Sequence, residues 1–331
     1  MIPVCRCPRR ARLALVLLLA VLPAAGCGAS ARRVGRIQTT ASPVVSVAGG
    51  APTHVAVIVM ENEEYGSIIG SAQTPFINGL ARRYGLARSL YATTHPSLPN
   101  YLALTGGATF GIDSDCTDCR VAATGLADQL RAAGVSWTAY MEGLPHPCFT
   151  GPQAGDYAKK HDPFAYYTRV TSDPAQCAHI VPFTRLAADQ RAGRLPRFLW
   201  ITPNLCHDMH DCAPVRGDAF LSRVVPSLLR ALGSTGVLFL TWGEGASDDG
   251  CCRLAAGGHI ATIVAGGGAR AGARLTSAAD QYSILQAIED LLHLPRLRGA
   301  ACACTPSLAP LLRPAVTARR PAGAPATATT G

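Results

Sequence analysis

The sequence predicts an α/β sandwich with a mostly parallel central sheet. Continuous apolar stretches rich in β-branched residues occupy 54–60, 197–202 and 236–242, a pattern typical of strands buried on both faces. Amphipathic helical patterns alternate with these stretches along the chain. Each of the three is followed by acidic or polar residues, and open α/β sheets bind their ligands at that end of their strands.

The other elements follow from the same patterns. In chain order we expect a helix over 74–84, a short strand over 87–92, a helix over 125–133, a strand over 136–141, an amphipathic helix over 218–232, a fourth buried strand over 259–265 and a closing helix over 280–294. Residues 142–184 show no clear period, so we interpret them as an insertion that forms one wall of the site.

Residues 1–27 have the features of a secretory signal: basic residues, an apolar run and then Ala-Ala-Gly-Cys27. The apolar run is too short to span a membrane. Cys27 stands where a bacterial lipobox places its lipidated cysteine, which predicts an exported protein anchored to the membrane by a lipid. Cleavage close by, without a lipid, is the alternative.

The mature chain is expected to have three parts. Residues 28–52 are small and polar and predict a flexible linker. Residues 53–300 predict the folded domain, and residues 301–331, rich in Ala, Pro and Thr, predict a disordered tail.

The net charge of +9 does not indicate a nucleic-acid partner. Residues 1–52 and 295–331 carry arginines and no acidic residue, so the part between them is slightly acidic. A nucleic-acid surface would need its basic residues gathered on the folded domain. Basic ends instead favour contact with an anionic membrane surface.

The chain has 13 cysteines. Removing those of the signal and Cys27 leaves an even number, which in an exported protein predicts disulfides. Cys251 and Cys252 are adjacent and are expected to bond elsewhere. A zinc site at Cys116 and Cys119 is the competing hypothesis for these two cysteines, but no second CxxC follows them. The expected local pairs are Cys116 with Cys119 and Cys206 with Cys212.

Ser97 is the candidate nucleophile. In Thr94-His-Pro-Ser-Leu-Pro-Asn-Tyr101 it comes two residues before a Pro-Asn pair that opens an apolar, helical segment. Proline is favourable near a helix start, and the free N–H groups of a helix N-terminus suit a phosphate. His95 is placed to orient a phosphate oxygen. An ordinary serine in a Pro-rich loop is the alternative.

Polar clusters that follow the three strands predict a divalent metal site. Carboxylate and imidazole groups gathered at one sheet edge could bind one or two cations. Such cations lower the pKa of a hydroxyl and hold the oxygens of a phosphoryl group, which would activate Ser97. Each cluster taken alone has another explanation, because Asp and Asn also cap helices and form turns. The clusters are Glu61 with Asn62; His207, Asp208, His210 and Asp211; and Glu244, Asp248 and Asp249.

A Ser-His-Asp hydrolase stays open as well. It would use Ser97 with one of four histidines. The sequence contains no GxSxG, no P-loop and no GxGxxG after a strand. The four histidines are His95, His207, His210 and His259.

Six motifs occur in an order that resembles the bacterial phosphoesterase family, which holds secreted acid phosphatases and phospholipases C. The resemblance covers about residues 54–294. It implies the α/β/α sandwich of the alkaline phosphatase superfamily, and it admits phosphoinositides as substrates. The motifs are Val-Ile-Val-Met-Glu-Asn, Thr-Pro-Phe-Ile-Asn, His-Pro-Ser-Leu-Pro-Asn-Tyr-Leu-Ala-Leu-Thr, Asn-Leu-Cys-His-Asp-Met-His-Asp, Gly-Asp-Ala-Phe-Leu and Leu-Thr-Trp-x-Glu.

The resemblance also implies roles for individual residues. Ser97 takes the position of the nucleophile and Asn100 that of a donor to a phosphate oxygen. Glu61 and Asn62 are implied as metal or phosphate contacts. The family's Asp-Met-His-Asp stretch corresponds to Asp208, His210 and Asp211.

The chain departs from the family pattern at two positions. Trp-Gly243-Glu244 stands where the family has Trp-Asp-Glu, and Gln281-Tyr-Ser stands for His-Tyr-Ser. At position 243 an expected carboxylate ligand of the metal is therefore missing. Either Glu244, together with Asp248 or Asp249, replaces this ligand, or metal affinity and activity are reduced.

We therefore expect an exported hydrolase of phosphate esters. Its substrate would be a small molecule or a lipid headgroup, cleaved as a monoester through a phospho-Ser97 intermediate with divalent metal assistance. A phospholipase C-type phosphodiesterase and a non-catalytic surface protein on the same fold are the alternatives.

Overall fold

The computed structural model describes residues 54–252 and 255–313. Their centre is a nine-stranded sheet with the order β10-β2-β9-β8-β1-β7-β3-β6, in which β11 also pairs with β2. The strands are β1 Val55–Met60, β2 Gly85–Tyr91, β3 Trp137–Met141, β6 Ile180–Pro182, β7 Phe198–Thr202, β8 Val237–Trp242, β9 His259–Ala265, β10 Arg274–Leu275 and β11 Ala279–Asp280.

The sheet is mostly parallel, as the sequence predicts. β1 pairs in parallel with β7 and β8, and β3 in parallel with β6 and β7. β9 is antiparallel to both β8 and β2. Because two reversals cancel, β2 points the same way as β8. The carboxyl ends of β1, β2, β7 and β8 therefore meet at one edge of the sheet.

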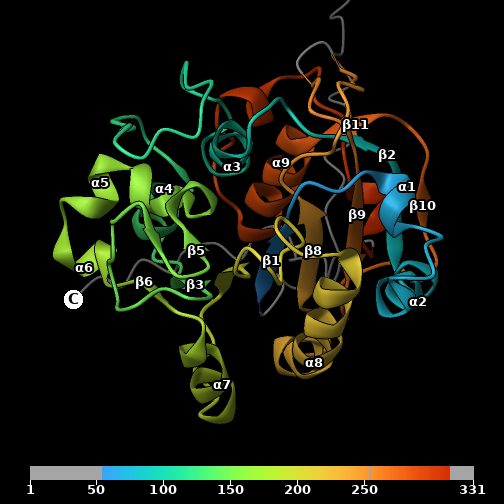
Figure 1. The fold of residues 1–331 in the computed structure, drawn as a ribbon, viewed down its shortest axis with the longest axis horizontal. Coiled ribbons are helices and arrows are strands. Elements are labelled where there is room, and N and C mark those ends of the chain that lie inside the picture. The colour runs from blue at the N-terminus through green and yellow to red at the C-terminus, as the bar shows by residue number, and fades with distance from the viewer. Residues whose placement is uncertain (1–53, 253–254, 314–331) are drawn as a thin grey trace, which may run out of the picture. The chain divides into compact units, whose positions relative to one another are not determined.

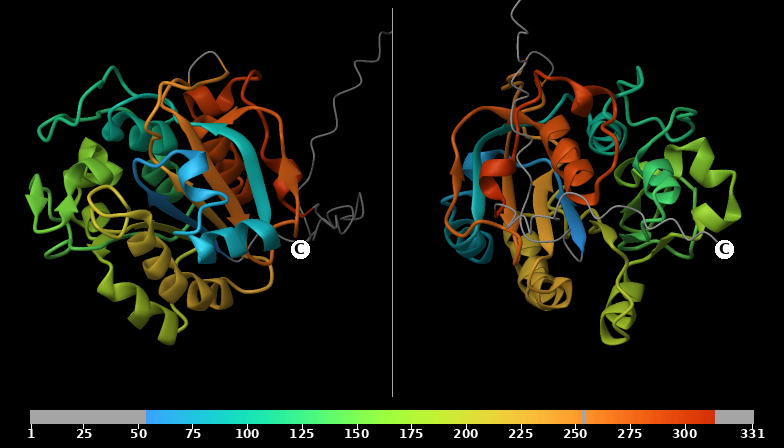
Figure 2. Two further views of the ribbon diagram at one scale, coloured as in Figure 1. Left: turned by 45° about the vertical axis from the view of Figure 1, so that its right-hand side comes forward. Right: turned by 180° about the vertical axis from the view of Figure 1, so that it is seen from behind.

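Every residue of β1, β7 and β8 is buried, so helices must cover both faces of the sheet. In Figures 1 and 2, α3 and α9 pack together on one face, while α2 and α8 pack together on the other. The longer helices are α2 Pro75–Arg83, α3 Ser97–Gly106, α4 Leu126–Ala132, α7 Thr184–Arg191, α8 Pro214–Leu232 and α9 Gln281–Leu292. The predicted α/β/α sandwich is confirmed.

Helix α8 begins four residues before the predicted start at Asp218, because Pro214 provides a favourable first residue. Asp218 instead faces α2: its carboxylate accepts hydrogen bonds from the backbone of Phe76 (3.1 Å) and Ile77 (2.8 Å). It thereby caps the N-terminus of the neighbouring helix.

The segment 142–184 folds into short elements along the β3–β6 side of the sheet. Its own hairpin and single turns precede β6, which joins the main sheet. The short elements of this segment are β4 Gln153–Ala154, β5 Tyr157–Ala158, η1 Lys159–His161, η2 Pro163–Tyr166, α5 Thr168–Thr171 and α6 Pro174–Cys177. Three further short elements lie outside it: α1 Tyr65–Ile68, η3 Arg298–Ala301 and η4 Ala309–Leu311.

The expected disordered tail from 301 is wrong for its first part. Leu308, Leu311 and Leu312 are buried, and the Arg313 N–H donates to the Gly268 carbonyl at 2.9 Å. This apolar stretch packs on the domain, which therefore extends to 313. The predicted signal with Cys27, the linker and the rest of the tail lie outside the described residues. None of the helices in the described part is long and apolar enough to cross a membrane.

The expected disulfides Cys116–Cys119 and Cys206–Cys212 are both present, so the first pair is no zinc site. The expectation that Cys251 and Cys252 bond elsewhere is wrong. They pair with each other, because the remaining cysteines of the described part also pair locally, Cys148 with Cys177 and Cys302 with Cys304.

Candidate active site

Ser97 lies at the sheet edge where the parallel strands end. It is the first residue of α3, it is fully buried, and β2 leads into it. Its hydroxyl donates to Glu244 Oε1 at 2.8 Å, and Glu61 Oε2 lies 3.4 Å away. Glu61 follows β1 and Glu244 follows β8, so three separate segments meet at this hydroxyl. The structure thus brings together the predicted nucleophile and two of the predicted acids.

A third acid, Asp208, completes a buried carboxylate cluster. Glu61 and Asp208 are wholly buried, and Glu244 is 4% exposed. The Glu61 N–H donates to the Asp208 carbonyl at 2.8 Å, which fixes the loop after β7 beside β1. Burial raises the pKa of Glu61 well above its usual range, and the charges of Glu244 and Asp208 add to it. Burial also raises the pKa of Asp208 to about 7. Such a cluster needs positive charge to be ionised.

His161, which the sequence patterns do not indicate, belongs to this cluster. Its Nδ1 lies 3.0 Å from Asp208 Oδ2, and its Nε2 lies 3.7 Å from Glu61 Oε1. The ring stacks on Tyr101 of α3, with centroids 5.2 Å apart. Burial, followed by the charge of Lys160, lowers the pKa of His161 well below its usual range, so the imidazole is neutral. The predicted wall of the site therefore contributes a side chain to it.

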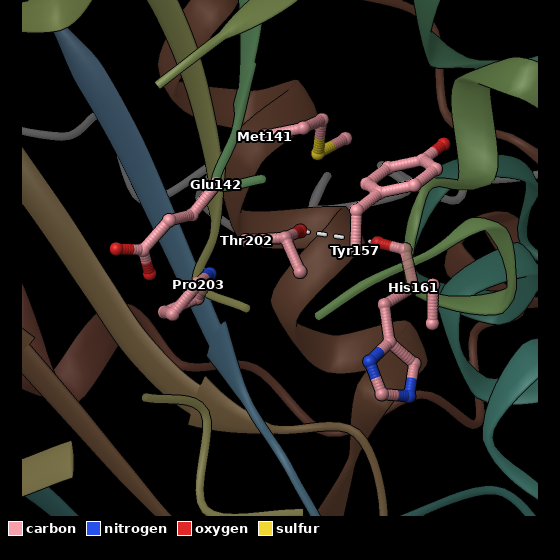
Figure 3. A pocket seen from close by; sticks show the side chains of 7 residues that line it. Met141, Glu142, Tyr157, His161, Thr202 and Pro203 are labelled. Atoms are coloured by element: carbon pink, nitrogen blue, oxygen red, sulfur yellow. Dashed lines mark hydrogen bonds between the residues drawn. The ribbon is translucent and has the colours of Figure 1, made fainter. Parts of the chain in front are cut away.

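The end of β7 holds His161 in place. The Thr202 hydroxyl donates to the His161 carbonyl at 3.1 Å, and Trp200 Nε1 donates to Thr202 Oγ1 at 2.9 Å. Figure 3 shows this contact beside a cavity of about 10 Å³, with the imidazole turned away from Thr202. A space of that size holds about one water molecule, so the backbone behind His161 is closely packed.

His95 lies on the opposite side of Glu244 from Ser97. Its Nδ1 pairs with Glu244 Oε2, and its Nε2 lies 2.9 Å from the Ser247 carbonyl. Burial lowers the pKa of His95, but the Ser247 carbonyl and Glu244 outweigh burial and raise it above its usual value. Ser97, Glu244 and His95 therefore form a continuous hydrogen-bonded chain.

The histidine of a Ser-His-Asp triad is not found. Among the described residues, the Ser97 hydroxyl bonds only to carboxylates. His207 pairs with Glu142 at 2.9 Å, and His259 stacks between Tyr65 and Tyr91. Neither histidine makes a contact with Ser97, so that alternative is wrong.

Two predicted ligands point away from the carboxylate cluster. His210 has both ring nitrogens engaged, Nδ1 with Asp211 at 2.6 Å and Nε2 with Lys160 Nζ at 3.0 Å. Asp211 is half-exposed. Lys160 also bonds Asp115, at 3.0 Å. This outer layer places one ammonium group beside the buried acids.

Asp248 is also remote, since its side chain is 96% exposed and lies 3.8 Å from His95. The solvent, rather than the cluster, surrounds its carboxylate. Asp249, the other acid considered, is exposed as well.

The two asparagines have different positions. With its amide nitrogen turned toward the acids, Asn62 donates to Glu61 (2.7 Å) and Glu244 (3.1 Å). Asn100 is fully buried and bonds only the preceding turn: its amide accepts from Thr94 N at 2.9 Å and donates to the carbonyls of Thr94 and Pro96. Its donors are used within the turn, which corrects the expectation that they face a phosphate.

The chemistry of the donors fits a cation. Within residues 54–252 and 255–313 no three His, Cys, Asp or Glu side chains form a ready metal-binding group. Glu61 Oε1, His161 Nε2 and Asp208 Oδ2 are nevertheless buried without a hydrogen-bond partner. With its proton on Nδ1, His161 directs the Nε2 lone pair toward the Glu61 oxygen, an arrangement that a cation would satisfy.

The fold is that of the alkaline phosphatase superfamily. A superfamily member from Vibrio parahaemolyticus superposes with a TM-score of 0.55 at 14% identity, covering 77% of this chain and 71% of that one. The lipoteichoic acid synthase LtaP from Listeria monocytogenes superposes with a TM-score of 0.54 at 11% identity, covering 77% and 78%. At such identities the similarity establishes the fold alone.

Residues 70–295 match the model of the phosphoesterase family, to which the chain belongs. It is 34% identical over 261 residues to a phosphatidylinositol-3-phosphatase of Mycobacterium tuberculosis, covering 77% of this chain and 83% of that protein. An acid phosphatase of Aspergillus fumigatus is 35% identical over 178 residues, covering 51% and 39%. This chain thus spans less than half of that fungal relative. Membership of the family makes the chain a hydrolase of phosphate esters.

Proposed function

We propose that the chain is an exported phosphatase that cleaves phosphate monoesters with Ser97 as its nucleophile and a divalent cation as its cofactor. The observation that carries the proposal is the 2.8 Å hydrogen bond from the Ser97 hydroxyl to a buried carboxylate, Glu244. The relatives named for monoester substrates, a phosphatidylinositol-3-phosphatase and an acid phosphatase, support it.

In the first step Ser97 Oγ attacks phosphorus and gives its proton to Glu244. The bond from phosphorus to the ester oxygen breaks, and the alcohol leaves with a proton from solvent. In the second step water attacks the phosphoserine and loses a proton to solvent, the P–Oγ bond breaks, Glu244 returns its proton to Ser97 Oγ, and inorganic phosphate is released. Ser97 is the first residue of α3, so the positive end of this helix, where the Leu98 N–H already donates to Asp115, favours negative charge at the reacting group.

His95 and Asn62 support this arrangement. His95 bonds the second oxygen of Glu244 and so orients the carboxylate toward Ser97. Asn62 bridges Glu61 and Glu244, which holds the two acids at a fixed separation.

Glu61, Asp208 and His161 are the residues that would hold the cation. Bound there, a divalent cation lowers the pKa of the serine hydroxyl and neutralises the phosphoryl oxygens. Glu61 Oε1, His161 Nε2 and Asp208 Oδ2 are buried without hydrogen-bond partners among the described residues, which leaves their lone pairs for the cation.

Export is supported by the five cysteine pairs in the described part, since disulfides persist in oxidising compartments. The signal-like residues 1–27 and the lipobox at Cys27 extend this to a lipoprotein on the bacterial surface.

The test is hydrolysis of an aryl phosphate monoester and of the matching diaryl diester by the oxidised protein. We expect turnover of the monoester and at least about a hundredfold loss in Ser97→Ala, the scale for a catalytic nucleophile. Preference for the diester would favour the phosphodiesterase alternative. A folded protein that turns over neither, across divalent metals and pH values, would support the non-catalytic alternative.

A further inference from the structure

A groove of about 460 Å³ is lined by Lys159, which precedes His161 of the candidate active site by two residues. Two of the segments that line it, 115–120 and 159–161, also contact the active site, where Asp115 accepts from the Leu98 N–H beside Ser97. The segment 115–120 places Asp115 against Lys160 and Thr117 at the groove. Helix η1 places Lys159 at the groove, while Lys160 and His161 face the acids. A 3₁₀ helix has three residues per turn, so consecutive side chains point in different directions.

Two cations share this groove. The Lys159 side chain is buried, donates to the Thr117 carbonyl at 2.7 Å and lies over the Tyr166 ring at 4.6 Å. Arg120 is exposed and makes no hydrogen bond or ion pair with any residue that the structure describes. Asp118 also lines the groove, so its balance is one positive charge.

The two cations disfavour each other. After burial, the charge of Arg120 is the next cause that lowers the pKa of Lys159. An anion between them would relieve this repulsion. Arginine binds phosphate oxygens in a bidentate manner, and hydroxyl groups can satisfy the remaining oxygens. The groove provides two that make no hydrogen bond within the described residues, at Thr117 and Thr150, whereas the hydroxyls of Thr168, Thr171 and Ser172 already donate to backbone carbonyls.

We propose that this groove binds a second phosphate group of the substrate, carried at a distance from the ester that is cleaved. The inference rests on the proposed function and gives it a substrate class: phosphate esters whose alcohol part bears another phosphate. Asp115 links the two sites, since it accepts from the Leu98 N–H beside Ser97 and from Lys160 next to Lys159, and the inference is that one extended substrate reaches both.

The test compares a hexose monophosphate with the corresponding bisphosphate. In the parent protein we expect a higher kcat/KM for the bisphosphate. Arg120→Gln should lower the ratio of the two kcat/KM values about tenfold, the scale of one charge-assisted hydrogen bond, and leave aryl phosphate turnover unchanged. Arg169→Gln is the matched control, because Arg169 is equally exposed but lines a separate depression with Thr124 and Asp128.

A lipid arm distinguishes the source of the second phosphate. The same comparison is made in mixed micelles, with phosphatidylinositol that carries either one or two phosphate monoesters on its inositol ring. If Arg120→Gln lowers the kcat/KM ratio in micelles but not for hexose esters, the groove is assigned to lipid headgroups. If it lowers the ratio for hexose esters but not in micelles, the groove is assigned to soluble esters. A ratio that Arg120→Gln leaves unchanged in both, or a parent protein without preference in either, overturns the inference.

Calorimetric binding to Ser97→Ala keeps this inference separate from the proposed function. If the parent protein shows no turnover but Ser97→Ala binds the bisphosphate more tightly than the monophosphate, and Ser97→Ala/Arg120→Gln does not, the groove stands while the catalytic proposal fails. If aryl phosphate is turned over and no such difference in affinity is measured, the catalytic proposal stands and the groove does not bind a second phosphate.

Discussion

The Gln281 side chain donates a hydrogen bond to the Gly243 carbonyl at 2.6 Å. These are the two positions at which the chain departs from its family's pattern, and they contact each other. The Gln281 amide oxygen accepts from the backbone and hydroxyl of Thr93, at 3.0 and 2.8 Å. A Cβ atom at position 243 would overlap the Glu61 carboxylate. The two departures therefore form one hydrogen-bonded unit that leaves room for Glu61.

Restoring the family's aspartate at this position should harm the protein. Gly243→Asp places a side chain where Glu61 lies and adds a further acid to a buried cluster, so Glu61 must move. We expect at least about a tenfold loss of kcat/KM, since small displacements at a catalytic site carry costs of this size, and a lower melting temperature.

Gly243→Ala separates the two causes, because it adds the clash without the charge. It should lose activity as well, though less. Higher activity or tighter metal binding in Gly243→Asp would show that Glu61 does not need the space.

A divalent cation should stabilise the folded protein through Glu61 and His161. Their unpartnered atoms face each other in the cluster, so a cation that binds the folded state raises the melting temperature in a concentration-dependent manner. We expect this rise with Mn²⁺ or Zn²⁺ in a thermal shift measurement, and its reversal by a chelator. Glu61→Gln and His161→Asn should both abolish it.

His146→Asn is the control, because His146 is exposed and outside the cluster. An equal rise in the parent protein and in His161→Asn would place the cation elsewhere.

Much of this site can be predicted from sequence because strand ends fix it. Glu61, Asp208 and Glu244 each come shortly after a buried strand, and parallel strands bring such positions together whatever the loops do. The turn before α3 identifies Ser97. In contrast, His210 and Asp211 follow Asp208 so closely that the pattern does not tell which of them turns inward. Tertiary contacts decide it.

His161 escapes sequence-based prediction for a related reason. It lies in a segment without apolar periodicity, and its position depends on a hydrogen bond to Thr202, which is distant in sequence. The available signal is the run of charged residues Lys159-Lys160-His161-Asp162, which stands between the stretches 143–155 and 163–168 that contain no Lys, Arg, Asp or Glu. The packing of residues 308–312 is equally hard to predict, because a tail rich in Ala, Pro and Thr conceals its few leucines.

Glu289 should make stability depend on pH. It is wholly buried in α9, and burial raises its pKa from 4.5 to about 8. The folded state therefore holds this proton where the unfolded state has lost it. Stability is highest below the unfolded pKa and falls as pH rises from about 4.5 to 8. We expect Glu289→Gln to flatten this decline and to gain on the order of 4 kcal/mol at pH 8, the size that the shift implies.

Urea unfolding at several pH values measures the effect. Asp290→Asn is a control at the next position, where the carboxylate is partly exposed and pairs with Arg296 at 2.7 Å. A parent and a Glu289→Gln variant with parallel pH profiles would mean that Glu289 is ionised in the folded state.

Asp218 should stabilise the contact between α8 and α2. It is 5% exposed, and its two carboxylate oxygens accept from Phe76 N and Ile77 N, so Asp218→Ala leaves two backbone N–H groups at a helix start without partners. We expect a loss of about 2 kcal/mol in the free energy of unfolding, the upper range for a helix cap, and a smaller loss in Asp218→Asn, which keeps one acceptor. Ser222→Ala, exposed on the same helix, should change stability by less than about 0.5 kcal/mol. If urea unfolding gives Asp218→Ala and Ser222→Ala the same stability, the carboxylate contributes nothing to the cap, and the apolar faces of α2 and α8 alone hold the two helices together.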